Sequence, residues 1–215
     1  MGSPRIRNSQ MDLTEQTRWN QRYSESPQSW VEPDTFLTAA YKEWLADTAP
    51  GPALDVAGGA GRNAVWLAER GWRVKLIDIS DVALKMAREK FEVVKKAASS
   101  QPKNAAVRKG SLKTEIVDLN SISHLGTEEY PLVVMFYFLR RELFPAISRA
   151  LKPGGTLIYR TYTIDRMKVP GGPSDPKYLL QPNELLHGFP GLRVLQYREM
   201  LQGKAAAELV ARKPV

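Results

Sequence analysis

The sequence predicts one α/β domain: a mostly parallel β-sheet with helices on both faces and an antiparallel pair of strands at its C-terminal end. Three observations predict this fold. Residues 52–78 have the pattern strand, glycine turn, helix, strand. Residues 132–138 form a continuous apolar run, which suits a strand covered on both faces. The strand patterns at 192–200 and 205–212 are separated only by residues 201–204, so they should pair antiparallel.

The segment 52–78 has the layout of a nucleotide-binding half-sheet. Its first strand has an acid, Asp55, near its end, and the glycine-rich turn 58–61 follows. An apolar helix then runs to Gly71, a residue suited to a left-handed helix end, and a second buried strand ends at Asp78. A glycine turn in a βαβ unit, followed by an acid about 20 residues further on, is typical of nucleotide binding.

The remaining elements follow from apolar spacing and capping residues. A helix at 14–23 carries Trp19 and Tyr23 on one side, and Asp34 can begin a helix that continues to residue 45. Ser80 can begin another at 81–96. Either 105–108 or 114–117 is the third strand, and we favour the second. Further along we expect a helix at 140–151, a turn at 152–155, a strand at 156–162, a long loop at 163–180 and a short helix at 181–187.

The composition narrows the class of protein. The chain has 215 residues, is 43% hydrophobic and contains no cysteine, which excludes disulfides, thiolate nucleophiles and cysteine zinc sites. No secretory signal or membrane-spanning run is visible, so we expect a cytoplasmic protein with no membrane association. We expect residues 1–12 to be a flexible tail and residues 13–215 to form one domain whose N-terminal part, 13–48, is a helical lid. A monomer is plausible, and no metal site is predicted.

The net charge of +8 raises the question of nucleic-acid binding. Much of the excess is local, because residues 85–113 contain nine Lys and Arg but only two acidic residues. Phe91 is the one aromatic residue there, and its helical spacing from Val94 places it on a core face. We therefore favour a solvated helix face over an RNA-binding surface.

The ordered motifs resemble the class I, seven-strand S-adenosylmethionine-dependent methyltransferases over nearly the whole chain. Asp55-x-Ala57-x-Gly59-x-Gly61 is similar to the first motif of that family, and Asp78 to its second-strand acid. Two further features are similar to motifs of that family: the Asp118-Leu119 pair and the turn 151–155. More narrowly, the segments 19–23, 61–68 and 171–176 resemble the bacterial small-molecule subgroup that includes tellurite-resistance and thiopurine methyltransferases. The resemblance implies the strand order 3-2-1-4-5-7-6.

Two positions depart from the family pattern. Ala57 replaces the first glycine of the motif, which is tolerable only if its backbone has φ below zero. Pro131 stands where many relatives carry an Asp.

The resemblance also implies roles for individual residues. Asp78 would bind the ribose hydroxyls of the cofactor, although it could merely cap the next helix. Asp55 would hold the glycine-loop amides or the cofactor's ammonium group, and Asp118 and Leu119 would contact adenine. Trp19, Arg22 and Tyr23 would form the lid, with Arg22 meeting the methionine carboxylate. The full predicted cofactor site is Trp19, Arg22, Asp55, Gly59, Gly61, Asn63, Asp78, Ile79, Asp118, Leu119 and Phe136.

The implied reaction is in-line methyl transfer from S-adenosylmethionine, which leaves S-adenosylhomocysteine, to a small-molecule acceptor. No general base is identified; Tyr137, Arg160 and Tyr162 are weak candidates for a catalytic role. The alternatives are an NAD(P)-dependent oxidoreductase, an RNA or protein methyltransferase that uses the segment 85–113, and a cofactor sensor without activity.

Overall fold

The computed structural model describes residues 13–26, 31–99, 110–169, 173 and 175–215. At its centre is one seven-stranded sheet with the order β3-β2-β1-β4-β5-β7-β6, which confirms the predicted topology. Every neighbouring pair from β3 to β5 is parallel, while β7 is antiparallel to both β5 and β6. The strands are β1 Pro52–Val56, β2 Arg73–Asp78, β3 Ser111–Ile116, β4 Tyr130–Phe136, β5 Leu151–Tyr162, β6 Arg193–Glu199 and β7 Ala206–Arg212.

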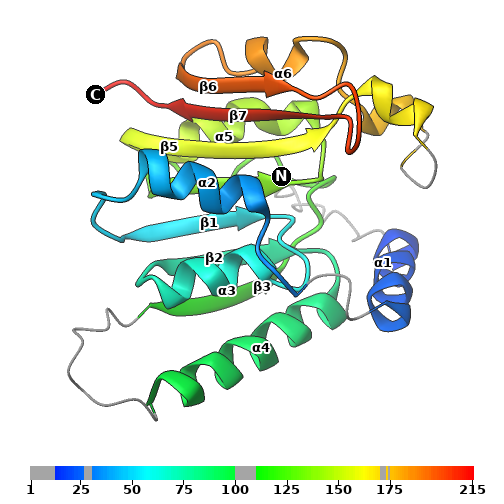
Figure 1. Ribbon diagram of the computed structural model, residues 1–215. Helices are drawn as coiled ribbons and strands as arrows, with labels where there is room; N and C mark the ends of the chain where they lie inside the picture. Colours follow the sequence, from blue (N-terminus) through cyan, green and yellow to red (C-terminus); the bar gives the residue numbers. More distant parts are fainter. Residues whose placement is uncertain (1–12, 27–30, 100–109, 170–172, 174) are drawn as a thin grey trace, which may run out of the picture.

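Helices cover both faces of the sheet (Figure 1). One face packs against α2 (Thr35–Trp44), α3 (Arg62–Glu69) and α4 (Asp81–Ser99), and the other against α5 (Phe144–Ala150) and α6 (Glu184–His187). Neighbouring residues of β1 show the division, because Ala53 belongs to the first core and Leu54 to the second. A strand with both faces buried needs apolar residues at successive positions, which is the pattern seen in the sequence.

Helix α1 (Leu13–Glu25) lies apart from the two helical layers, beside the ends of the central strands (Figure 1). Side-chain hydrogen bonds attach it to the turn between β2 and α4. Gln16 Nε2 donates to the Ile79 carbonyl at 3.0 Å, and Asn20 Nδ2 donates to Asp81 at 2.7 Å. Ser80 Oγ donates a third hydrogen bond to Asn20 Oδ1 at 2.7 Å. These bonds hold α1 over the carboxyl edge of the sheet.

The predicted helix starts are confirmed at two caps. Asp34 accepts a hydrogen bond from the Phe36 amide at 2.9 Å, and Ser80 Oγ accepts one from the Ala83 amide at 3.0 Å. Gly71 has a φ of 91°, as expected for a residue that follows the end of α3.

Several boundaries differ from the prediction. Strand β4 ends at Phe136 and not at residue 138, because Tyr137 has a φ of 57° and turns the chain out of the sheet. Leu151 pairs with Tyr130 as the first residue of β5, so the predicted turn at 152–155 is an irregularity inside that strand. The predicted helix at 140–151 begins instead with a 3₁₀ turn, η2 (Arg141–Leu143), before α5.

The long segment 163–180 contains two further 3₁₀ turns, η3 (Ile164–Lys168) and η4 (Pro176–Tyr178). The third strand is β3 at Ser111–Ile116, as favoured; the alternative at 105–108 lies outside the described residues. Residues 1–12, predicted as a tail, and 171, 172 and 174 of the motif at 171–176 lie outside them too.

Candidate functional site

A pocket opens at the carboxyl ends of β1, β2, β3 and β4, where the turns that follow these strands meet. It encloses about 830 Å³ of empty space when the open solvent at its mouth is included. Helix α1 contributes side chains to the same pocket, so the candidate lid lies over the predicted nucleotide site. The lining residues are Glu15, Trp19, Tyr23, Asp55, Ala57, Gly58, Ala60, Arg62, Asn63, Asp78, Ile79, Val117, Asp118, Leu119, Asn120, Phe136, Tyr137 and Phe138.

The glycine turn after β1 has a compact left-handed path. Gly59 and Gly61 have φ values of 56° and 75°. A side chain at Gly58 would meet the Asp55 carboxyl at 2.7 Å, so the turn packs directly on that acid. Ala57 also has a positive φ, 53°, and the expectation of a negative value at this position was wrong. The chain needs the left-handed conformation immediately after Val56, and Ala57 adopts it despite its Cβ.

Gly59 and Gly61 do not line the pocket themselves. The Gly59 amide donates to Asp78 Oδ2 at 2.9 Å, and a Cβ at this position would lie 2.1 Å from the Tyr23 hydroxyl. A Cβ at Gly61 would lie 2.6 Å from that of Ala87, so Gly61 permits the close packing of α3 on α4. The two glycines therefore shape the site, while Ala57, Gly58 and Ala60 line the pocket.

Asp55 is the most unusual side chain in the pocket. It is 1% exposed, and neither carboxyl oxygen has a hydrogen-bond partner among the residues that the structure describes. Burial, together with the charge of nearby Asp78, raises the pKa of Asp55 to about 8, although Arg62 and the nearby Ala64 amide oppose the shift. A buried carboxyl group without partners costs free energy, and a cationic or hydrogen-bond-donating ligand would remove that cost.

Asp78 links the glycine turn to the next turn of the chain. It accepts hydrogen bonds from the Gly59 and Ser80 amides, both at 2.9 Å, and burial raises the pKa of its carboxyl group. Ser80, and not Asp78, provides the side-chain cap of α4. Each carboxyl oxygen of Asp78 retains a second lone pair at the pocket wall, where the hydroxyl groups of a ligand could donate.

Asp118 and Leu119 follow β3 and lie in the pocket wall beside Asp78. The Val117 amide donates to the Asp78 carbonyl at 2.9 Å, which fixes the position of this segment. Asp118 Oδ1 accepts from the Asn120 amide at 2.8 Å, and both residues line the pocket. The predicted pair is therefore brought to the same edge of the sheet as Asp55 and Asp78.

The residues of α1 divide into two groups. Trp19 and Tyr23 line the pocket, with their ring centroids 6.1 Å apart. Arg22 is exposed, with its guanidinium 5.2 Å from the centroid of the Trp19 ring, and it does not line the pocket. The predicted contact of Arg22 with the methionine carboxylate stays a prediction.

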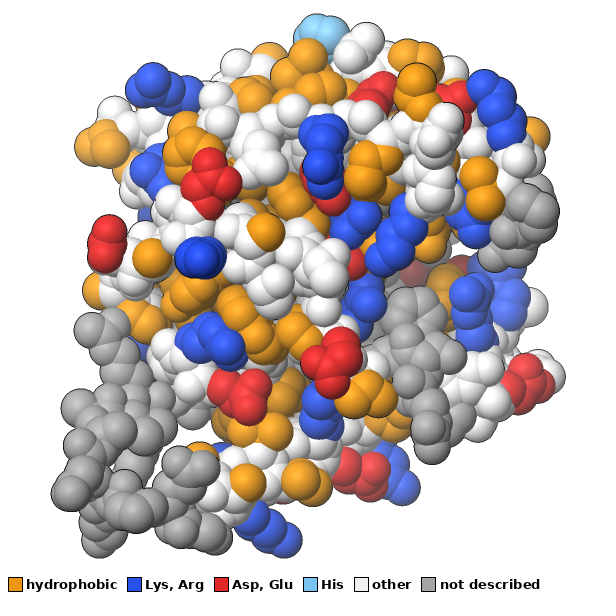
Figure 2. Space-filling model, in the orientation of Figure 1, with side chains coloured by type: hydrophobic (Ala, Val, Ile, Leu, Met, Phe, Trp, Pro, Cys, Tyr) orange, Lys and Arg blue, Asp and Glu red, His pale blue; other side chains and the backbone are white. Residues whose placement is uncertain are grey.

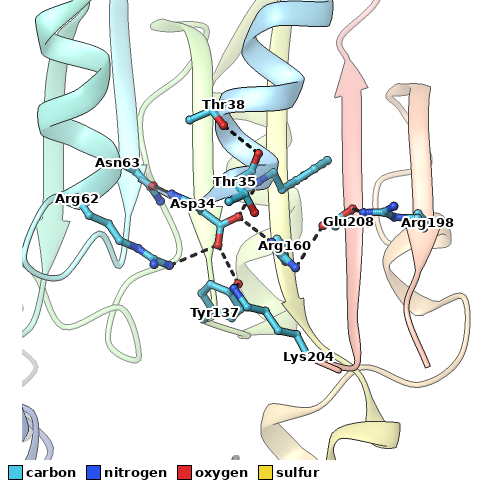
Figure 3. Close-up of polar contacts among 11 residues, drawn as sticks. Asp34, Thr35, Thr38, Arg62, Asn63, Tyr137, Arg160, Arg198, Lys204 and Glu208 are labelled. Atoms are coloured by element: carbon cyan, nitrogen blue, oxygen red, sulfur yellow. Dashed lines mark hydrogen bonds and ion pairs between the residues drawn. The ribbon is translucent and has the colours of Figure 1, made fainter. Parts of the chain in front are cut away.

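A polar cluster lies on the α2 side of the pocket and centres on Asp34 (Figure 3). Arg160 Nη1 donates to Asp34 Oδ1 at 2.8 Å, and the Tyr137 hydroxyl donates to Oδ2 at 2.8 Å. Arg62 lies 3.5 Å from the same carboxylate, and Asn63 Oδ1 accepts from the Asp34 amide at 2.9 Å. Burial by itself raises the pKa of Asp34, but Arg160 and the hydrogen bonds outweigh it and hold that pKa below its usual range.

The three weak catalytic candidates have different positions. Tyr137 lines the pocket; Arg160 and Tyr162 do not. Arg160 is 4% exposed and forms ion pairs with both Asp34 and Glu208, at 2.8 and 3.4 Å. This buried and ion-paired arrangement indicates that Arg160 positions neighbouring side chains. The Tyr162 and Tyr137 rings lie 4.9 Å apart, so Tyr162 extends the aromatic surface beyond the pocket.

Eight of the eleven predicted cofactor residues line this pocket; Arg22, Gly59 and Gly61 do not. Sequence reasoning missed four charged residues of the Asp34 cluster: Arg62, Lys204, which contacts Tyr137, and the pair Glu208 and Arg198, which contacts Arg160. It treated Asp34 only as a helix cap. The sequence did contain a signal for this cluster. Glu208 of β7 and Arg160 of β5 are charged residues within apolar strand patterns, and such residues are rarely buried unless they are paired. In the part of the chain that the structure describes, no group of His, Asp and Glu is arranged to hold a metal ion.

The matched family is consistent with this geometry. Residues 54–159, from β1 to β5, match the family described as a methyltransferase domain. The sheet order and the glycine turn fit the class I methyltransferase fold, and the matched stretch contains the glycine turn and the strands β2 to β4.

Among curated proteins, the chain is 26% identical over 133 residues to the putative methyltransferase YqeM of Bacillus subtilis (strain 168). The match covers 57% of this chain and 48% of the relative, so the chain spans about half the length of that protein.

Solved structures share the fold. TehB from Haemophilus influenzae has a TM-score of 0.61 at 18% identity, covering 91% of this chain and 67% of that one. A methyltransferase from Mesorhizobium loti has a TM-score of 0.60 at 16% identity, covering 83% and 98%. A third structure has a TM-score of 0.63 at 19% identity, and the match covers 93% of this chain and 92% of that one. It concerns the conversion of a disulfide bond into a thioacetal group during echinomycin biosynthesis.

Proposed function

We propose that this protein transfers a methyl group from S-adenosylmethionine to a small-molecule acceptor. The observation that carries the proposal is the pair of buried strand-end acids, Asp55 and Asp78, on either side of a glycine turn in one pocket. When bound, S-adenosylmethionine supplies a methyl group on a sulfonium, which is already activated toward a nucleophile. The protein's task is then mainly to position the acceptor, since good orientation can supply about 7–11 kcal/mol.

The residues present fit the cofactor. Asp55 offers two buried oxygen atoms without partners to an ammonium group. Asp78 offers its remaining lone pairs to two neighbouring ribose hydroxyls, and Asp118 and Leu119 lie where an adenine would follow. Phe136, Tyr137 and Phe138 supply aromatic surface beside the end of β4, and aromatic faces favour a cation such as a sulfonium.

The two main alternatives are weaker. A dinucleotide-dependent oxidoreductase has a parallel six-strand sheet, whereas β7 here is antiparallel. A role for the basic segment in binding RNA is not favoured, because lysines of α4 pair with acids of the same helix, Lys85 with Glu89 and Lys95 with Glu92. The other lysines and arginines at 103–109 lie outside the described residues.

Isothermal titration tests the cofactor. We expect micromolar binding of S-adenosylmethionine and of S-adenosylhomocysteine, and none of NAD(H) or NADP(H). Preferential binding of a nicotinamide dinucleotide would overturn the proposal. Turnover is tested separately by release of S-adenosylhomocysteine with a panel of thiol, selenium, tellurium, nitrogen and oxygen acceptors. Binding without release across the panel would indicate a sensor.

Substitution of Asp78 tests the predicted ribose contact. We expect Asp78→Ala to weaken S-adenosylmethionine binding by about 1–3 kcal/mol, the cost of lost hydrogen bonds to a charged acceptor. Asp78→Asn keeps the shape of the side chain and should weaken binding less. Asp47→Ala, at an exposed position after α2, is the matched control and should bind normally. Unchanged affinity in a folded Asp78→Ala protein would remove Asp78 from the site.

A further inference from the structure

The Asp34 cluster carries more positive than negative charge. Its cationic members are Arg62, Arg160, Arg198 and Lys204, and its two acids are Asp34 and Glu208. The acids are occupied: Asp34 pairs with Arg160 and Arg62, and Glu208 pairs with Arg160 and with Arg198 at 2.7 Å. The cluster therefore has an excess of two positive charges beside the pocket. In Figure 2 Lys and Arg side chains gather around a hollow on the right of this face.

Lys204 is the member of this cluster that no acid neutralises. It lies in the turn between β6 and β7, and its Nζ donates to the Tyr137 hydroxyl at 3.2 Å. Lys204 forms no ion pair among the described residues; burial lowers its pKa, and the charges of Asp34 and Glu208 oppose that shift. Lys204 does not line the pocket itself, but its partner Tyr137 does. Antiparallel pairing brings this turn to the carboxyl end of β5, so the ammonium group lies at the edge of the sheet that holds the pocket. Figure 3 shows it directly beside Tyr137, which lines that pocket.

The same end of the pocket has no available proton acceptor in the part of the chain that the structure describes. The Tyr137 hydroxyl already donates to Asp34, and burial, with the charge of Asp34, raises the pKa of Tyr137 well above its ordinary value. Asp34 in turn accepts from the Phe36 amide, Tyr137 and Arg160. An acceptor that arrives as a carboxylate needs no base at this position: one of its oxygens would form the new O–CH3 bond as the S–CH3 bond of the cofactor breaks, which gives a neutral methyl ester and neutral S-adenosylhomocysteine.

Aromatic side chains lie on one side of the Lys204 ammonium group, whose Nζ is 5.6 Å from the centroid of the Tyr137 ring. Tyr137 and Tyr162 form a tilted pair 4.9 Å apart, and Phe138 adds a third ring to the pocket wall. Such a surface can pack against the apolar part of a small ligand. One ammonium group without an ion-pair partner can bind one negative charge on that ligand. A sulfonium in the neighbouring cofactor site would also attract an anion, more strongly because this edge is partly desolvated.

We propose that the methyl acceptor is a small monoanion, a carboxylate on an apolar or aromatic body, whose negative charge is held by Lys204 beside Tyr137. The proposal names the substrate class of the site and rests on the proposed methyltransferase function. Arg160 and Asp34 act as positioning residues that fix the Tyr137 ring, while Lys204 contacts the ligand.

The test uses the full chain saturated with S-adenosylhomocysteine, and benzoate and benzamide as probes that differ in charge but hardly in shape. Ligand-observed NMR titration gives both affinities. We expect benzoate to bind more tightly than benzamide, and Lys204→Met to weaken benzoate binding about ten-fold, within the range for a hydrogen bond to a charged group. Lys204→Arg keeps the charge and should retain most of the affinity. Lys85→Met, on the exposed face of α4, is the control and should leave benzoate binding unchanged.

The outcomes separate the two proposals. Tight binding of S-adenosylhomocysteine with equal affinities for benzoate and benzamide would overturn the anion site and leave the methyltransferase proposal standing. The anion site is likewise overturned if Lys204→Met binds benzoate as well as Lys85→Met does. If S-adenosylhomocysteine does not bind, the proposed function is wrong, and the benzoate titrations repeated without it still decide whether Lys204 holds an anion. Added sodium chloride should weaken benzoate binding and spare benzamide.

Discussion

Asp55 is a side chain whose burial costs free energy when no ligand is bound. The carboxyl group ends a strand that is buried on both faces, and Gly58 packs against it. No partner in the described structure satisfies its oxygens, so the protonated form is favoured in the ligand-free protein. Binding of a cation would reverse this preference, which makes Asp55 a link between cofactor binding and protonation.

The pH dependence of stability tests this role of Asp55. Between the ordinary pKa near 4 and the native pKa of about 8, the folded protein keeps a proton that the unfolded chain has released. The free energy of unfolding should therefore fall as pH rises through this window, by at most about 1.4 kcal/mol per pH unit from this group. We expect Asp55→Asn to remove this contribution and to be the more stable protein at pH 8, by roughly 2–4 kcal/mol.

Urea denaturation of wild type and Asp55→Asn at pH 5, 6, 7 and 8 gives the comparison. Asp47→Asn, at an exposed position, should keep the wild-type slope. A constant difference between wild type and Asp55→Asn at all four pH values would show that Asp55 is ionised in the folded protein throughout.

At the scale of elements, Asp34 joins four parts of the fold. It caps α2, contacts Arg62 and Asn63 of α3, and accepts from Tyr137 after β4 and from Arg160 of β5. The carboxylate is fully buried, and Arg160 is nearly so. Removing one member of such a pair leaves the other as an uncompensated buried charge, which is usually more costly than the pair is stabilising.

Asp34→Ala should therefore lower the free energy of unfolding by about 3–5 kcal/mol, of which about 1 kcal/mol is the lost helix cap. Asp34→Asn retains a good capping residue and should be clearly less destabilised. Glu43→Ala, exposed on the same helix, is the control. Equilibrium denaturation in guanidinium measures all three. Equal losses for the Ala and Asn variants would show that the charge, and not the cap or the hydrogen bonds, is what matters.

For the whole molecule, topology decides where function can lie. Parallel β1, β2, β3 and β4 place their carboxyl ends on one edge, and reversed β7 brings its preceding turn to that same edge. Side-chain bonds from Gln16 and Asn20 hold α1 over it. Residues from position 15 to position 138 thereby line one pocket, and Lys204 contacts one of them, Tyr137. Among the described helices, none is long and apolar enough to span a bilayer.

Ligand binding should therefore stabilise the whole domain. S-adenosylhomocysteine at about 100 times its Kd should add about 2.7 kcal/mol to the free energy of unfolding. For a chain of this size that corresponds to a rise in Tm of roughly 5–10 °C, measurable by differential scanning fluorimetry. NADH at the same concentration should produce no shift. Equal shifts for both ligands, or none for either, would contradict the cofactor assignment.

Local sequence patterns predicted much of the fold and the acids of the proposed cofactor site. Apolar periodicity, the glycine turn and the two caps predicted a mostly parallel sheet and placed Asp55 and Asp78 near strand ends, while the strand order came from the family resemblance. The positive φ of Ala57 was missed because it depends on the path of the turn, and the exposure of Arg22 because helical spacing does not fix how α1 sits on α4.

The sequence by itself determined the fold class and the strand-end acids of the proposed cofactor site, since these depend on neighbours within one βαβ unit. Only the tertiary structure decided the proposed acceptor site. Asp34, Tyr137, Arg160 and Lys204 come from four distant segments, and no periodic pattern joins them. Their meeting requires the reversed β7 and the docking of α2 on the sheet, so their shared excess of charge becomes visible only once the chain is folded.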